Sequence, residues 1–111
     1  MAIKYEFHGT QLTSTSETTL LTAPTNQQII IKSIRVSTVG AFTPSVSFQV
    51  EDSSTSTKYY VQYLKLLVAN TSVEVLDNPL VLESADKLLV TSTTTDRLDI
   101  TISYMGVATN E

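Results

Sequence analysis

The sequence of 111 residues fits a single domain, since a folded chain near this size buries roughly 65% of the surface that its unfolded form exposes. It has no cysteine, which excludes disulfide bonds and thiolate metal sites, and its net charge of −4 argues against a basic nucleic-acid surface. No secretory signal follows Met1, and no run approaches the roughly 20 apolar residues that span a bilayer. We therefore expect a protein made in a cytoplasm, with no nucleic acid and no membrane among its partners.

The chain begins with a period-two pattern that is typical of a half-buried strand. Ile3, Tyr5 and Phe7 alternate with charged or ionisable residues, and residues 9–17 then break the alternation. One interpretation is an ordinary loop that returns an edge strand to its own sheet, which the usual shortness of connections favours. The other is an arm that pairs with a neighbouring subunit. The predicted organisation is an N-terminal strand or arm with its loop over residues 1–17, and a β-sandwich domain over residues 18–111.

Further strands are predicted along the rest of the chain. Residues 28–36 are rich in isoleucine, and β-branched residues at that density favour a strand that lies centrally in a sheet. Residues 59–68 have some helical spacing, but their aromatic and β-branched content favours a strand. The remaining strands are expected at residues 18–22, 45–50, 72–76, 80–82, 87–93 and 98–104.

Turn residues separate these segments at spacings of roughly 8 to 12 residues, which leaves no room for crossover helices. Examples are Pro24, Pro44 and Asn78-Pro79. This spacing predicts an all-β fold, a single antiparallel β-sandwich of about eight strands, either jelly-roll-like or Ig-like.

Candidate catalytic and metal-ligating residues are few. The only histidine, His8, lies near the chain start, and the acidic residues form no calcium-binding loop. Gly9, Gly40 and Gly106 are scattered singly, so no phosphate-binding loop is present. We expect no catalytic residues, no metal site and no cofactor; an enzyme would need a pair of acidic residues that meet in space.

One aromatic cluster, Tyr59, Tyr60 and Tyr63, falls on a predicted strand. Two of these three tyrosines are expected in the core. Tyr60 opposes the other two on a strand and is the candidate for a partner contact, because tyrosine combines a large contact area with a polar tip. The first strand supplies the other candidates, Ile3, Tyr5 and Phe7, which we expect to contribute to contacts with further subunits or with another partner protein.

A longer pattern resembles small β-sandwich virion proteins of tailed phages. It runs through residues 18–26, residues 29–37, Tyr59-Tyr60, residues 77–83 and 86–90, and residues 98–104, in that order. The resemblance covers residues 18 to 104, and its motifs are turns and strands. It departs where Ser84-Ala85-Asp86 replaces the usual glycine of a turn, which leaves the type of that turn open.

The resemblance implies a non-enzymatic phage virion protein, in particular a capsid decoration (cement) protein that binds and stabilises the shell. Its implied partners are the major capsid protein or another virion protein and further copies of itself as a homo-oligomer. Its implied location is the virion, assembled in the host cytoplasm. A neck or tail accessory protein and a carbohydrate-binding host-attachment module stay open as alternatives; the absence of tryptophan argues against the second.

Overall fold

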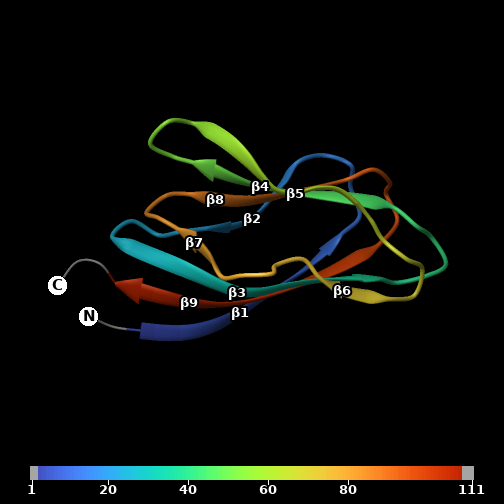
Figure 1. Cartoon of the computed structure of the whole chain (residues 1–111), viewed down its shortest axis with the longest axis horizontal. Coiled ribbons are helices and arrows are strands. Elements are labelled where there is room, and N and C mark those ends of the chain that lie inside the picture. Colours follow the sequence, from blue (N-terminus) through green and yellow to red (C-terminus); the bar gives the residue numbers. More distant parts are fainter. Residues whose placement is uncertain (1–2, 109–111) are drawn as a thin grey trace.

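The computed structural model describes residues 3–108, which form nine strands in two antiparallel sheets (Figure 1). The strands are β1 (Ile3–Leu12), β2 (Thr18–Thr22), β3 (Gln27–Thr38), β4 (Ser45–Asp52), β5 (Thr57–Leu66), β6 (Ser72–Glu74), β7 (Leu80–Leu82), β8 (Lys87–Ser92) and β9 (Leu98–Ala108). The predicted antiparallel β-sandwich is confirmed, and the predicted strands match the observed ones to within a few residues at most ends. No helix able to cross a membrane occurs in this described range.

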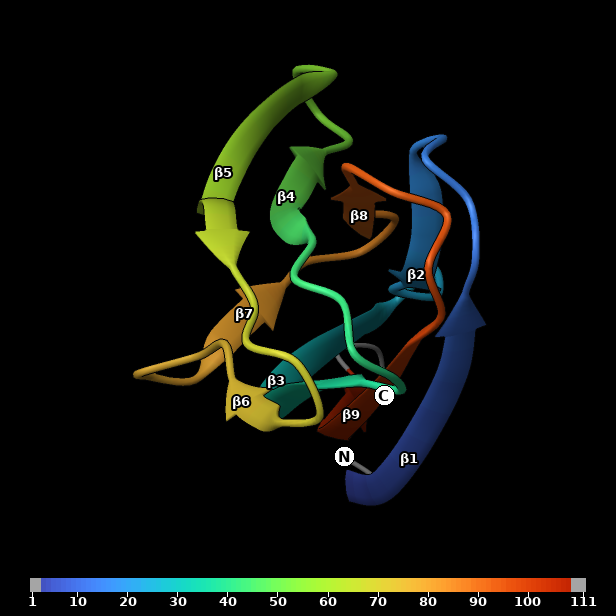
Figure 2. The ribbon, with the colours of Figure 1, turned by 90° about the vertical axis from the view of Figure 1, so that its right-hand side faces the viewer.

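The strand order is that of a jelly roll. The first sheet, sheet A, has the order β1-β9-β3-β6, with β7 also paired to β3, and sheet B has the order β2-β8-β4-β5. Successive strands alternate between the sheets, as in the double-sheet jelly roll, with two exceptions. β4 and β5 both belong to sheet B, and β6 and β7 both belong to sheet A, where each pairs with β3. Figure 2 shows the two layers, with β1 and β2 along one side and β5, β6 and β7 along the other. Of the two sandwich types predicted, the topology selects the jelly roll.

The core lies between the sheets and is built from inward-facing aliphatic residues of both. Phe48 of β4 is its one fully buried aromatic side chain among the described residues, and it belongs to the same core cluster as Ile34, Leu88 and Ile102. As predicted, β3 is central: it pairs with β9 on one side and with β6 and β7 on the other. Burial of these side chains is the main stabilising contribution to a fold that has no cysteine.

The turn between β7 and β8 contains the segment where the resemblance departs from its pattern. Ala85 has φ of +69°, a left-handed conformation that glycine adopts at less cost. Its N–H donates to the carbonyl of Ala23 at 2.8 Å. The buried carboxylate of Asp86 accepts hydrogen bonds from the backbone N–H groups of Ser53 and Glu83, each at 3.0 Å. The turn therefore keeps a glycine-like backbone without glycine, because neighbouring hydrogen bonds hold it in place.

The first strand differs from its prediction in two ways. It continues to Leu12, through residues predicted as a loop, because Leu12 is buried and pairs with Leu98 of β9. All ten residues of β1 pair with β9 of the same chain, so the edge-strand interpretation describes this structure. The strand expected at residues 3–8 is present, but none of residues 3–7 is buried, so the expectation that one of its faces is buried there is wrong.

Candidate interaction surfaces

The register of β1 against β9 decides which way the first strand faces. Leu12 pairs with the core residue Leu98, so the even-numbered residues of β1 point toward the interior side of sheet A. The odd-numbered residues point outward. Ile3, Tyr5 and Phe7 are therefore on the outer face of sheet A, with 56%, 79% and 68% of their surface exposed. Here the usual arrangement is inverted, with apolar residues outside and charged residues on the inner side.

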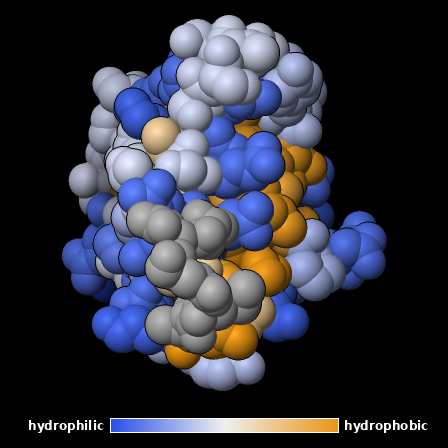
Figure 3. Space-filling model, turned by 90° about the vertical axis from the view of Figure 1, so that its left-hand side faces the viewer, coloured by the Kyte–Doolittle hydropathy of each residue, from blue (hydrophilic) through white to orange (hydrophobic). Residues whose placement is uncertain are grey.

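These side chains continue across the sheet as one row. Tyr5 lies opposite Met105 of β9, Met105 lies opposite Ile30 of β3, and Ile30 lies opposite Val81 of β7. Directly opposed residues on one face of a sheet have Cβ atoms about 5 Å apart, so the four side chains are neighbours. We call this surface the apolar face and define it as Ile3, Tyr5, Phe7, Ile30, Val81, Met105 and Val107. Viewed from the end where β1 begins and β9 ends, hydrophobic residues gather in a band down one side of the molecule (Figure 3).

The other half of the same outer face is polar. Its rows pair Thr101 with Arg35 and Asp99 with Ser37, and Gln11 of β1 lies opposite Asp99. A change from apolar to polar thus occurs along each strand, between the residues near Phe7 and those near Gly9. Such segregation is typical of a surface that a partner covers over part of its area.

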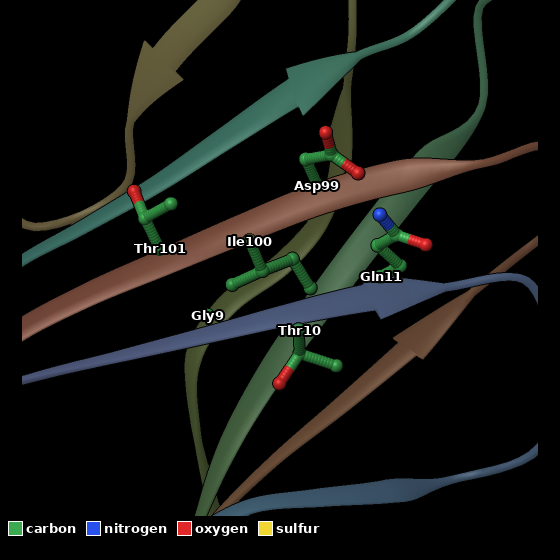
Figure 4. A pocket seen from close by; sticks show the side chains of 6 residues that line it. All are labelled: Gly9, Thr10, Gln11, Asp99, Ile100 and Thr101. Atoms are coloured by element: carbon green, nitrogen blue, oxygen red, sulfur yellow. The ribbon is translucent and has the colours of Figure 1, made fainter.

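A hollow with a volume of about 410 Å³ lies on this polar half. It is lined by three residues of β1, among them Gly9, and by three of β9, and Figure 4 shows Gln11 and Thr10 on opposite sides of β1. Its one carboxylate, Asp99, is engaged by Arg97, whose Nε and Nη2 atoms donate at 2.9 and 3.1 Å. This contact raises the pKa of Arg97 and leaves Asp99 occupied. The hollow offers hydrogen-bonding groups and one ion pair.

The interior side of β1 carries the remaining ionisable groups of this region. His8 Nε2 lies 3.0 Å from the hydroxyl of Thr10, and Glu6 lies opposite Tyr104. Partial burial and the negative charge of Glu6 raise the pKa of Tyr104. Within residues 3–108, no three His, Asp or Glu side chains are grouped so that they could hold a metal ion.

A second exposed aromatic surface lies on β5, the end strand of sheet B. Tyr59, Tyr60 and Tyr63 are 58%, 56% and 60% exposed, so the expectation that two of them lie in the core is wrong. The reason is topological, because β5 is the end strand of sheet B and pairs only with β4. The turn that joins β4 to β5 lies on the side of the molecule away from sheet A (Figure 2). The rings of Tyr60 and Tyr63 contact each other edge to face, with centroids 4.7 Å apart. The candidate Tyr60 is thus part of an exposed pair.

The backbone of β5 is irregular. Its register against β4 shifts twice, and Leu64 has φ of +49°, which is rare for a residue with a branched side chain. The N–H of Leu64 donates to the hydroxyl of Ser47 on β4 at 2.9 Å. A β-bulge of this kind increases the local twist and disrupts the hydrogen-bonding row. The tyrosines of β5 therefore stand on a twisted edge.

The four candidate residues lie on two separate surfaces. Ile3, Tyr5 and Phe7 are together on the apolar face, and Tyr60 is on the other sheet. Sequence reasoning did not identify the rest of the apolar face, in particular Ile30, Val81 and Met105. Local alternation could not reveal them, because they are brought beside Tyr5 only by pairing between distant strands.

No protein-family model matches the sequence, and no curated protein matches it. Among solved structures, a similar chain belongs to the virus-like particle of the extra small virus (XSV) of the giant freshwater prawn Macrobrachium rosenbergii. It is 11% identical, covering 95% of this chain and 80% of that chain, with a TM-score of 0.33. A likeness at this level does not carry a function from one protein to another.

Proposed function

We propose that this protein is a non-enzymatic structural protein of a phage virion, specifically a capsid decoration protein that binds the shell and stabilises it. The observation that carries the proposal is the apolar face, where aligned side chains of four strands stand on the outer side of sheet A. No other part of the described chain covers Tyr5 and Phe7. A contiguous apolar surface beside a polar one is a typical site of protein–protein contact.

The composition of the remaining surface agrees with this role. Charged residues make up 16% of the chain, and serine and threonine occupy many of the exposed positions in the described residues. Such a surface forms hydrogen bonds with little charge repulsion between closely packed neighbours. A decoration protein binds at many equivalent sites, and each bound copy stabilises the assembled shell by mass action. The resemblance of residues 18–104 to virion proteins of tailed phages supports the phage assignment, with assembly in the host cytoplasm.

The test uses purified heads of the encoding phage, prepared from a mutant that lacks this chain. We expect the purified protein to co-sediment with these heads and to raise the temperature at which they release DNA. Val81→Ser should weaken binding by roughly tenfold, because burying an exposed valine contributes about 1.5 kcal/mol. Gln11→Ser, a substitution on the polar half of the same face, is the matched control and should bind as the unchanged protein does.

Two results would contradict this function. Failure of the unchanged protein to bind heads, combined with binding to isolated tails, would assign it to the neck or tail. Equal binding by Val81→Ser and the unchanged protein would show that the apolar face does not form the contact.

The exposed tyrosines of β5 favour a second candidate, a carbohydrate-binding module for host attachment. Aromatic rings can stack on sugars, and three of them lie within five residues. The rings of Tyr60 and Tyr63 are inclined at 71°, however, so they do not form a flat platform. Binding to a glycan array that is lost in Tyr60→Ala but kept in Val81→Ser would establish this candidate in place of the first.

A further inference from the structure

The outer edge of β1 is open and regular. β1 is the end strand of sheet A, and no other strand of the described chain pairs with its second edge. Its ten residues pair with β9 without a register shift. Proteins usually protect such edges with bulges, proline, short strands or charged side chains. Residues 3–12 have no bulge and no proline, and their two charged side chains, Lys4 and Glu6, are of opposite sign. A long, regular edge strand with exposed apolar side chains is a site to which another strand can be added.

We propose that β1 pairs with β1 of a second copy of this chain, antiparallel, about a two-fold axis at Tyr5. In this register Tyr5 lies opposite its own copy, and Lys4 lies opposite Glu6 of the second copy. Ile3 then lies opposite Phe7. Opposite charges face each other twice and apolar residues face apolar residues, so the segment Ile3–Phe7 is complementary to itself.

Neighbouring registers are less favourable because they place like charges opposite each other. Antiparallel strands related by a two-fold axis place residue i opposite itself at the centre. A centre at Lys4 places two lysines opposite each other, and a centre at Glu6 places two glutamates there. Like charges in directly opposite positions are destabilising. Charge therefore selects Tyr5 over the two adjacent centres.

Pairing in this register would extend the structure in a specific way. The two copies of sheet A become one continuous sheet, and the outer faces of both lie on the same side because the axis is perpendicular to the sheet. The apolar row of one copy, which ends at Tyr5, then continues into the row of the second copy. The pairing concerns the protein alone and does not require the virion role proposed above.

The main test exchanges the charges. Lys4→Glu has glutamate at both positions and Glu6→Lys has lysine at both, so each variant alone should be monomeric in sedimentation equilibrium. An equimolar mixture should form the heterodimer, because opposite charges then face each other in both pairs. The unchanged protein should dimerise at high protein concentration and less so at high salt, since exposed charge pairs are screened. A mixture that stays monomeric, or single variants that dimerise as the unchanged protein does, would overturn the proposal.

A second test determines the register and does not depend on charge. The chain has no cysteine, so a single introduced cysteine reports only its own position. Directly opposed residues have Cα atoms about 4.5–5.5 Å apart, within the range that a disulfide can bridge. Tyr5→Cys should therefore form an oxidised dimer rapidly. Phe7→Cys should not, because its two copies would lie about 13 Å apart. Faster cross-linking of Phe7→Cys would refute the centre at Tyr5.

The outcomes separate this inference from the proposed function. Val81 lies on β7, away from the β1 edge, so Val81→Ser should dimerise normally while binding heads weakly. Loss of dimerisation with unchanged head binding would reject the β1 pairing alone. Normal dimerisation with no head binding would reject the decoration role alone.

Discussion

β1 and β5 are both end strands with exposed aromatic side chains, yet their edges differ. β1 keeps an unbroken register with its neighbour over ten residues, whereas β5 shifts register twice and carries Leu64 in a left-handed conformation. A regular edge offers a row of backbone groups to another strand, and a bulged edge does not. The comparison shows that exposed aromatic residues alone do not define an interaction mode. Strand addition is suited to β1, and contact through side chains is suited to β5.

The largest expected effect tests whether β1 has one end that is needed for folding and one that is not. Leu12→Ala should lower the free energy of unfolding by about 2–5 kcal/mol, because Leu12 is buried in the core. Phe7→Ala should change it by no more than about 0.5 kcal/mol, since its side chain is exposed. Urea unfolding at low protein concentration measures both. If Phe7→Ala is as costly as Leu12→Ala, the apolar end of β1 is needed for folding and is not free for a partner.

A smaller effect is expected at the bulge of β5. Ser47→Ala should cost about 1 kcal/mol, because it removes the acceptor of the Leu64 N–H at a partly buried position. Leu64→Gly, the complementary variant, should stabilise the protein by up to about 1 kcal/mol by relieving the left-handed backbone. Thermal unfolding reports both changes. A neutral Ser47→Ala would show that this hydrogen bond does not hold the bulge.

The smallest effect concerns the contact between β1 and β9 at alkaline pH. The pKa of Tyr104 is raised above its usual value of 10.0 in the folded protein by partial burial and by Glu6. The folded state therefore keeps this proton to higher pH than the unfolded state does. The resulting stability is present below about pH 10 and is lost as pH rises through the folded pKa. Urea unfolding from about pH 8 to about pH 11 should show a steeper decline for the unchanged protein than for Tyr104→Phe. Identical slopes would show that the pKa of Tyr104 is not raised in the folded protein.

Most of the fold follows from local pattern. Alternation along residues 98–104 and the isoleucine-rich segment at 28–36 predict β9 and β3, because the period of a strand is visible within a few residues. The extension of β1 to Leu12 was missed, since one leucine among polar residues does not form a pattern. Its pairing with Leu98, far along the chain, makes that segment a strand.

The candidate surface was predicted only in part. Ile3, Tyr5 and Phe7 are visible as an alternating apolar set, but their alternation equally describes a strand whose apolar side is buried. The same ambiguity led to the wrong expectation for Tyr59 and Tyr63. Periodicity shows which residues share a face of a strand. It does not show whether another sheet covers that face.

The sequence by itself determined an all-β chain of about eight strands, without cysteine and with few groups suited to catalysis, because strand period and residue chemistry are local properties. Only the tertiary structure decided that β1 and β5 are end strands, that the apolar side of β1 faces outward, and that Tyr5 is in line with Val81. These features depend on the order and register in which strands far apart in the chain pair. A one-residue change in that register would turn every side chain of β1 to the other face.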